Sequence, residues 1–263
     1  MFSSAGREGI EPLPLATIYE CVMAVAEGRA DRALVPIENS LEGSVNATLD
    51  ALVFETDEVR IVGEVVHPIR HTLVARNELP LGEIERVISH PQASAQCARF
   101  LRTKLADAEV VSASSTADAV RIVAGADHPW AALGTRLSAE LYGCKVLADR
   151  VEDISDNETR FVWLERDAGR LPTADGRPFK TSIVFFGLPD SPGSLVGVLQ
   201  EFAARGVNLS KIESRPRKQG LGRYVFFADL EGHEQDPVIV EALAAVGAAV
   251  ETLRVLGCYP AAA

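Results

Sequence analysis

The chain has 263 residues, 47% of them hydrophobic and 24% charged, and a formal net charge of −11. These values are typical of a globular protein that forms one large domain or two ordinary ones. The acidic balance argues against nucleic acids and anionic membranes as partners, and no apolar run approaches the ~20 residues of a membrane span.

The four cysteines, Cys21, Cys97, Cys144 and Cys258, are far apart and show no metal-ligand spacing. We therefore expect them to be buried and reduced, serving as small apolar residues. The stretch Met1–Gly9 has neither the apolar core nor the cleavage site of a secretory peptide, which predicts a cytoplasmic protein.

Short apolar runs alternate with helical patterns in the first part of the chain. Ile18, Val22 and Val25 would share one face of a helix that ends before Gly28. Further helices are expected at 45–52, 97–105 and 117–124, the last capped by Ser115 or Thr116, and strands at 33–35, 61–66, 87–89, 110–111 and 131–133. This alternation predicts an α/β domain with largely parallel sheets.

A stretch rich in Gly and Pro without apolar periodicity separates this part from a smaller one. We predict a first domain at 1–166, a linker at 167–179 and a second domain at 180–263. In the second domain, strands are expected at 181–186, 208–214, 224–230 and 250–256, with helices at 193–205 and 236–246. The order βαββαβ is that of a ferredoxin-like unit.

Polar side chains follow several predicted strands of the first domain, and Thr159-Arg160-Phe161 leads into another strand. Ligands of α/β proteins usually bind where strands end, and helix N-termini there favour anions. Each segment also has a local explanation, such as a capped turn or a strand that begins with Thr beside a surface Arg. The segments are Glu38-Asn39-Ser40, Ser89 to Gln92 with Gln96 one turn later, Ser114-Ser115-Thr116, and Thr159-Arg160-Phe161.

No glycine-rich phosphate loop and no His/Asp/Glu cluster with metal spacing occurs in the sequence. We therefore expect neither a cofactor nor a metal. The combination of motifs, in this order and at these separations, resembles prephenate dehydratase, and the resemblance covers about 10–260. The second domain resembles an ACT domain, a regulatory module, through Pro192-Gly193-Ser194-Leu195, Gly206-Val207-Asn208-Leu209 and Glu213-Ser214-Arg215-Pro216.

The resemblance implies a two-lobed catalytic domain, like periplasmic binding proteins, that converts prephenate to phenylpyruvate on the route to phenylalanine. It implies that Thr159 contacts the departing hydroxyl or a substrate carboxylate, with Arg160 as the nearby cation and Asn39 as a further catalytic residue. Glu38 remains open as an acid or as the partner of an Arg. Substrate-binding roles are implied for Ser40, Ser89, Gln96, Ser114, Ser115, Thr116 and Phe161.

For the ACT domain, the resemblance implies an amino-acid effector, expected to be phenylalanine acting by feedback. Its pocket would be formed by Gly193, Ser194, Leu195, Asn208, Glu213, Ser214, Arg215 and Pro216. ACT modules pair side by side, and a four-stranded sheet with one bare face needs cover. A homodimer or homotetramer is therefore expected.

Two other functions stay open from the sequence. Arogenate dehydratase would act on the amino-acid analogue of prephenate, and a non-catalytic amino-acid sensor would use both halves for binding alone. Family members also open with a strand and a Gly-Pro-x-Gly-Thr/Ser loop. The stretch Ala5–Gly9 is not that loop, so we expect the start of this chain to be incomplete and its activity to be affected.

Overall fold

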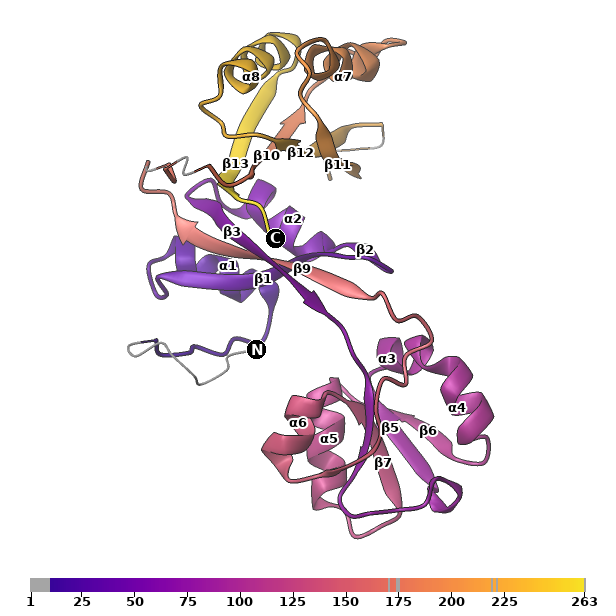
Figure 1. Ribbon diagram of the computed structural model, residues 1–263. Coiled ribbons are helices and arrows are strands. Elements are labelled where there is room, and N and C mark those ends of the chain that lie inside the picture. The colour runs from indigo at the N-terminus through magenta and orange to yellow at the C-terminus, as the bar shows by residue number, and fades with distance from the viewer. Residues whose placement is uncertain (1–9, 170, 174–175, 219, 221, 263) are drawn as a thin grey trace. The chain divides into compact units, whose positions relative to one another are not determined.

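The computed structural model describes residues 10–169, 171–173, 176–218, 220 and 222–262. The chain divides into two compact units, one formed by Met1–His67 with Thr159–Ala263 and the other by Pro68–Glu158 (Figure 1). The stretch Ala5–Gly9 lies outside the described residues. Among the described residues, no helix has the length and apolar character needed to cross a membrane.

The first lobe of the predicted catalytic domain belongs to the first unit. Its sheet has the order β2 (Gly43–Ser44), β1 (Arg32–Asn39), β9 (Glu158–Arg166) and β3 (Val59–Pro68). β1 runs antiparallel to both β2 and β9. Helix α1 (Ile18–Ala26) begins at Thr17 with a capping box to Glu20, and α2 (Asn46–Asp50) continues into a π-helical turn, η1 (Ala51–Glu55).

The predicted ACT domain, called the ACT domain below, is also part of the first unit. Its sheet has the order β11 (Leu209–Pro216), β12 (Tyr224–Glu231), β10 (Phe179–Phe186) and β13 (Thr252–Pro260). Helices α7 (Ser194–Ala204) and α8 (Pro237–Ala249) complete the order βαββαβ. The predicted ferredoxin-like unit is confirmed, with ends that differ by a few residues.

The two faces of the ACT sheet bury different partners. Strand alternation turns Ile183 and Phe185 toward a core that includes α7 and α8, whereas Val184 and Phe227 join the core of the catalytic lobe. A Cβ on Gly257 would lie 2.1 Å from the carbonyl oxygen of Ile61, so only glycine allows the two backbones to approach this closely. The face that we expected to be bare is thus covered by the chain's own catalytic lobe.

The second unit is the other lobe of the catalytic domain. Its sheet has the order β6 (Glu109–Ser112), β5 (Arg86–Ser89), β7 (Trp130–Gly134), β4 (Thr72–Ala75) and β8 (Lys145–Ala148). Its helices are α3 (Pro91–Gln96), α4 (Ala98–Lys104), α5 (Thr116–Gly125) and α6 (Arg136–Tyr142), with a 3₁₀ turn η2 (Leu81–Glu83).

The expectation of largely parallel sheets was wrong. In the second unit, β5 pairs in parallel with β6 and β7, since helices connect these strands, whereas β4 is antiparallel to β7 and β8. In the first lobe, β9 pairs with β1 only after the chain has passed through the second unit, and it returns in the opposite direction. Both sheets therefore contain pairings between strands that lie far apart in the sequence, and no local pattern predicts such pairings.

All four cysteines are free thiols in the structure. Cys97 and Cys258 are buried, and Cys21 and Cys144 are partly buried. Burial raises the pKa of Cys97 to about 12, which keeps this thiol protonated and unreactive at neutral pH. The expectation of small apolar residues holds for the two buried cysteines.

Candidate active site

Thr159 and Asn39 form the centre of the polar group in the first unit. They face each other in the register of β1 and β9, and Asn39 Nδ2 donates to Thr159 Oγ1 at 2.9 Å. The backbone amides of Leu41 and Glu42 donate to Asn39 Oδ1 at 3.0 Å each, which fixes the orientation of the amide. Because Thr159 Oγ1 accepts from Asn39, its own proton is directed toward another acceptor.

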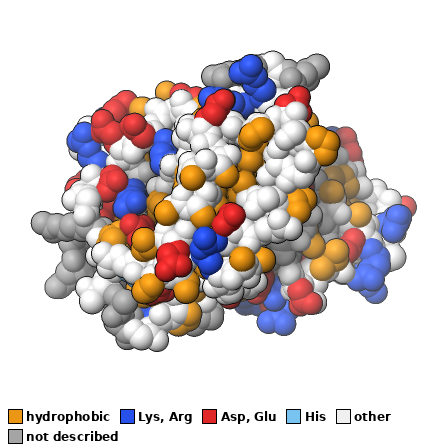
Figure 2. All heavy atoms as spheres, turned by 90° about the horizontal axis from the view of Figure 1, so that it is seen from above, with side chains coloured by type: hydrophobic (Ala, Val, Ile, Leu, Met, Phe, Trp, Pro, Cys, Tyr) orange, Lys and Arg blue, Asp and Glu red, His pale blue; other side chains and the backbone are white. Residues whose placement is uncertain are grey.

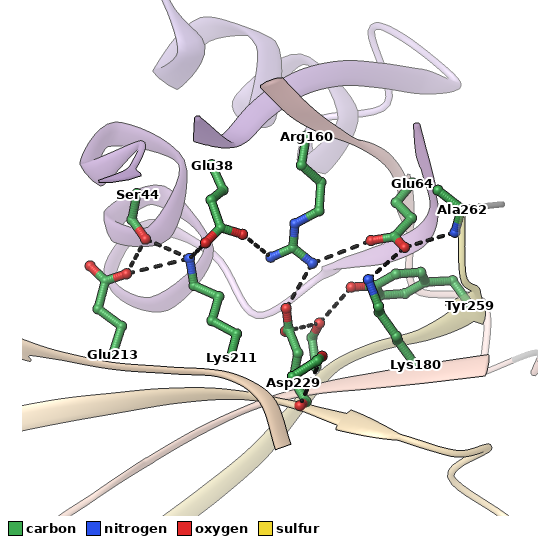
Figure 3. A network of polar contacts seen from close by, with 12 residues as sticks. Glu38, Ser44, Glu64, Arg160, Lys180, Lys211, Glu213, Asp229, Tyr259 and Ala262 are labelled. Carbon is green, nitrogen blue, oxygen red and sulfur yellow. Dashed lines mark hydrogen bonds and ion pairs between the residues drawn. The ribbon is translucent and has the colours of Figure 1, made fainter. Parts of the chain in front are cut away.

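Arg160 lies beside this pair and is almost entirely buried, with 9% of its surface exposed. Its guanidinium forms ion pairs with Asp229 at 2.7 Å, Glu38 at 3.0 Å and Glu64 at 3.2 Å (Figure 3). Burial by itself lowers the pKa of a guanidinium, but the charges of Asp229, Tyr259 and Glu38 and the hydrogen bond to Asp229 together outweigh it, so the pKa of Arg160 is raised. Arg160 is thus a permanent cation held by carboxylates of the protein.

Glu38 is the partner of two cations. Besides Arg160, it contacts Lys211 Nζ of the ACT domain at 3.3 Å, and Lys211 also donates to Ser44 Oγ at 2.5 Å. Of the two possibilities that the sequence left open for Glu38, the geometry favours the ion-pair partner. Ser40 is exposed in the turn after β1.

The second unit brings Gln96 together with two buried side chains. Gln96 Oε1 accepts from Asn157 Nδ2 at 3.2 Å and lies 2.8 Å from His71 Nε2. Since the amide oxygen cannot donate, the proton of His71 is on Nε2. His71 is 6% exposed and Asn157 1%, so the orientation of the Gln96 amide is determined by buried donors.

Other predicted residues of the second unit have structural partners. Ser89 is fully buried and its hydroxyl donates to the carbonyl of Leu133 at 3.1 Å. Ser115 is the cap of α5 and accepts from the amide of Asp118, while Ser114 donates to the Asp118 carboxylate at 2.8 Å. Thr116 is the first residue of α5.

The N-terminus of helix α5 is therefore already occupied by a carboxylate of the chain itself, that of Asp118. A hydrogen bond from Arg121 lowers the pKa of Asp118, and the hydrogen bond from Ser114 lowers it further. The carboxylate of Asp118 is in the first turn, where the helix dipole favours negative charge. An anionic ligand at this position would have to compete with Asp118.

The predicted effector residues are divided by the alternation of β11. Glu213 contacts Ser44 and Arg215 forms an ion pair with Asp50 at 2.9 Å, so both point toward the catalytic lobe. Ser214 is exposed on the opposite face of β11, together with Pro216.

The first helix of the ACT domain begins near the exposed group. Gly193 adopts φ +90° as the N-cap residue of α7, and Ser194 follows it with its hydroxyl 2.8 Å from that of Ser191. Asn208 is exposed and Leu195 packs at the edge of the ACT core. The structure thus separates Glu213 and Arg215 from the other residues expected to form one pocket.

Several residues of these groups were missed from the sequence. His71 and Asn157 lie outside every motif, and no periodic signal marks them. Glu64, Lys180 and Asp229 were read only as members of strands or their flanks. A charged residue on the buried side of a strand was the available signal, since such residues are rarely buried without a partner.

The comparisons with known proteins give the class first. The sequence pattern of the prephenate dehydratase family matches residues 1–169, and that of the ACT domain matches residues 182–248. This combination is a catalytic α/β domain followed by a regulatory domain. The chain belongs to the prephenate dehydratase family.

Individual relatives agree. The chain is 40% identical over 250 residues to the bifunctional chorismate mutase/prephenate dehydratase of Aquifex aeolicus, and it covers 66% of that protein, just under two thirds. It is 38% identical over 266 residues to the prephenate dehydratase of Bacillus subtilis, covering 98% of this chain and 92% of the relative.

Solved structures share the fold of this chain over most of its length. A prephenate dehydratase from Arthrobacter aurescens in complex with L-Phe matches with a TM-score of 0.85 and 41% identity, covering 95% of this chain and 81% of that one. A structure described as GqqA, a novel type of quorum quenching acylase, matches with a TM-score of 0.85 and 33% identity, covering 96% of this chain and 90% of that one.

Proposed function

We propose that this chain converts prephenate to phenylpyruvate and is inhibited by phenylalanine. The observation that carries the proposal is the Thr159 hydroxyl, held at 2.9 Å by Asn39, one position along β1 and β9 from the Arg160–Glu38 ion pair. The same residues were singled out from the sequence as catalytic. Relatives with 38–40% identity that span most of the chain support the assignment.

The conversion of prephenate to phenylpyruvate requires of the protein mainly hydrogen-bond donors held in position. The bond from the ring to its carboxylate breaks, and that electron pair enters the ring. The ring C–O bond then breaks, and the leaving hydroxyl takes up a proton to depart as water. Thr159 assists this departure by hydrogen bonding, because a Thr hydroxyl is too weak an acid for full proton transfer.

For Gln96 of the second unit, a substrate contact stays a prediction from the resemblance. The donors His71 and Asn157 orient its amide, so that little side-chain freedom is lost when substrate binds. Arg160 orients Glu38 and the start of β9, since its guanidinium is already held by three carboxylates. Ser40 and Phe161 are retained as substrate contacts, on the resemblance alone.

Measurement of phenylpyruvate formed from prephenate tests this function directly. We expect turnover with prephenate, and arogenate supplied in parallel separates the dehydratase from arogenate dehydratase. No turnover of either compound, together with binding of phenylalanine, would favour the amino-acid sensor. Because one structural relative is described as an acylase, hydrolysis of an N-acyl substrate is the further outcome to be measured.

A homodimer or homotetramer is expected in solution, with a cytoplasmic location like that of other biosynthetic enzymes. The support is the resemblance to paired ACT modules and the free edge of β11, where Ile212 is 47% exposed. On the helical face of the ACT domain, apolar side chains lie among charged ones (Figure 2). Sedimentation at micromolar concentration should therefore give a species near twice 28.2 kDa or larger, and only the 28.2 kDa species would contradict the prediction.

A further inference from the structure

We propose that Asp229 of the ACT domain is a positioning residue for the catalytic lobe. Its carboxylate holds the guanidinium of Arg160, which in turn pairs with Glu38, and the two are the register neighbours of Thr159 and Asn39 on β9 and β1. The inference rests on the proposed function for its effect on turnover. It makes the ACT sheet a part of the active-site scaffold even when no effector is bound.

A row of residues across the ACT sheet carries the argument. Lys211, Asp229, Ser182 and Gly257 are neighbours in the register of the four strands, so they share one face. This face packs against the catalytic lobe. At Gly257 the contact is so close that a side chain would overlap the backbone of Ile61. Asp229 is therefore placed by backbone contacts as well as by its own hydrogen bonds.

The carboxylate of Asp229 has little freedom to move. It is 6% exposed, and Oδ1 accepts from Ser182 Oγ at 2.6 Å while Oδ2 lies 2.7 Å from Arg160 Nη1. Tyr259 OH lies 2.7 Å from the same Ser182 hydroxyl. Burial raises the pKa of Tyr259, and the charge of Asp229 raises it further, so the phenol stays neutral beside the carboxylate.

Arg160 transmits this position to the catalytic lobe. Nη1 faces Asp229 and Glu64, whereas Nη2 faces Glu38 (Figure 3). The side chain of Glu64 is fully buried and also binds Lys180 at 2.8 Å. Without the charge of Asp229, the guanidinium would be drawn toward Glu64 and Glu38 alone, and β9 at Thr159 would shift with it.

A second ion pair provides a matched comparison. Arg60 of the catalytic lobe contacts Glu234 of the ACT domain at 3.6 Å, and Glu234 is 16% exposed at its side chain. This pair joins the same two parts of the chain but includes none of the site residues. If Asp229 merely attached the ACT domain, the loss of either charge would have the same effect on turnover.

The test compares Asp229→Asn with Glu234→Gln in the full chain. We expect Asp229→Asn to lower kcat at least 10-fold with a smaller change in KM, and Glu234→Gln to leave kcat within twofold. Asp229→Glu, which restores the charge, should recover part of the loss. A folded Asp229→Asn protein with kcat within twofold of the wild type, or equal losses in both variants, would overturn the proposal.

Two further measurements keep the test decisive. If Asp229→Asn does not fold, Ser182→Ala removes the hydrogen bond that fixes the carboxylate, and a kcat unchanged in that variant would contradict the inference. The ¹⁵N–¹H signal of Arg160 Nε, assigned by its absence in Arg160→Lys, needs no turnover. The chemical shift of this signal should change in Asp229→Asn and stay the same in Glu234→Gln. If the wild-type protein proves inactive, the proposed function is overturned, but the signal still tests the positioning role of Asp229. An unmoved signal would refute the positioning role.

Discussion

Replacing Thr159 with Ala is expected to lower kcat by about 100-fold or more while the protein remains folded. The hydroxyl is held by Asn39 Nδ2 at 2.9 Å, and in the proposed mechanism its proton bonds the departing oxygen of the substrate. A preorganised donor of this kind contributes most in the transition state, where charge develops on that oxygen. The measurement is phenylpyruvate formation at saturating prephenate, with circular dichroism to check folding.

A matched control separates catalysis from packing. Thr181 is fully buried and its hydroxyl donates to the carbonyl of Gly232 at 2.9 Å, inside the ACT domain. Thr181→Ala therefore removes the hydroxyl of another buried Thr, together with its hydrogen bond, and should leave kcat within twofold. Thr159→Ser keeps the hydroxyl and should recover most activity. Near-normal turnover of a well-folded Thr159→Ala protein would remove Thr159 from the mechanism.

The sequence predicted elements better than it predicted how they pair. The strand around Val35 and the helix after Ser115 were recognised because apolar periodicity and capping residues are local signals. The antiparallel partner of β1 is β9, which follows it by more than a hundred residues. No local pattern specifies such a pairing, and the expectation of parallel sheets failed for that reason.

The candidate site shows the same division. Asn39 and Thr159 were named from motifs, and the structure brings the two side chains into contact across β1 and β9. The partners that orient such residues were not named, because Asp229 and His71 act through three-dimensional contacts in a strand and a loop. Asp229 is a buried charge and His71 has a buried ring nitrogen, Nδ1, without a hydrogen-bond partner among the described residues. Both properties become visible only when the fold is known.

The alternation of β11 suggests how an effector could act on the catalytic lobe. The exposed side of the strand, with Ser214, lies on the face opposite to Lys211 and Arg215. Those two side chains reach Glu38 at 3.3 Å and Asp50 at 2.9 Å. A ligand that shifts or stiffens β11 from its exposed face would therefore move contacts on the other face.

Phenylalanine is expected to bind the full chain and to inhibit it. The N-terminus of α7 at Ser194 offers amide groups for the ligand carboxylate, and Leu195 offers apolar surface. Inhibition requires different affinities for two states of the enzyme, typically a coupling of ~1–3 kcal/mol, or about 5–150-fold in affinity. Calorimetry gives the binding, and the phenylalanine concentration for half-inhibition gives the coupling.

Arg215→Gln should separate binding from inhibition, because it removes the ion pair to Asp50 in the catalytic lobe. We expect this variant to bind phenylalanine nearly as the wild type does and to be inhibited more weakly. Arg205→Gln is the control, because Arg205 pairs with Glu201, one turn earlier in α7, and this ion pair lies within the ACT domain. Unchanged inhibition in Arg215→Gln would show that the coupling follows another route. No heat of binding in the wild type would mean that the ACT domain serves assembly and scaffolding of Arg160 rather than sensing.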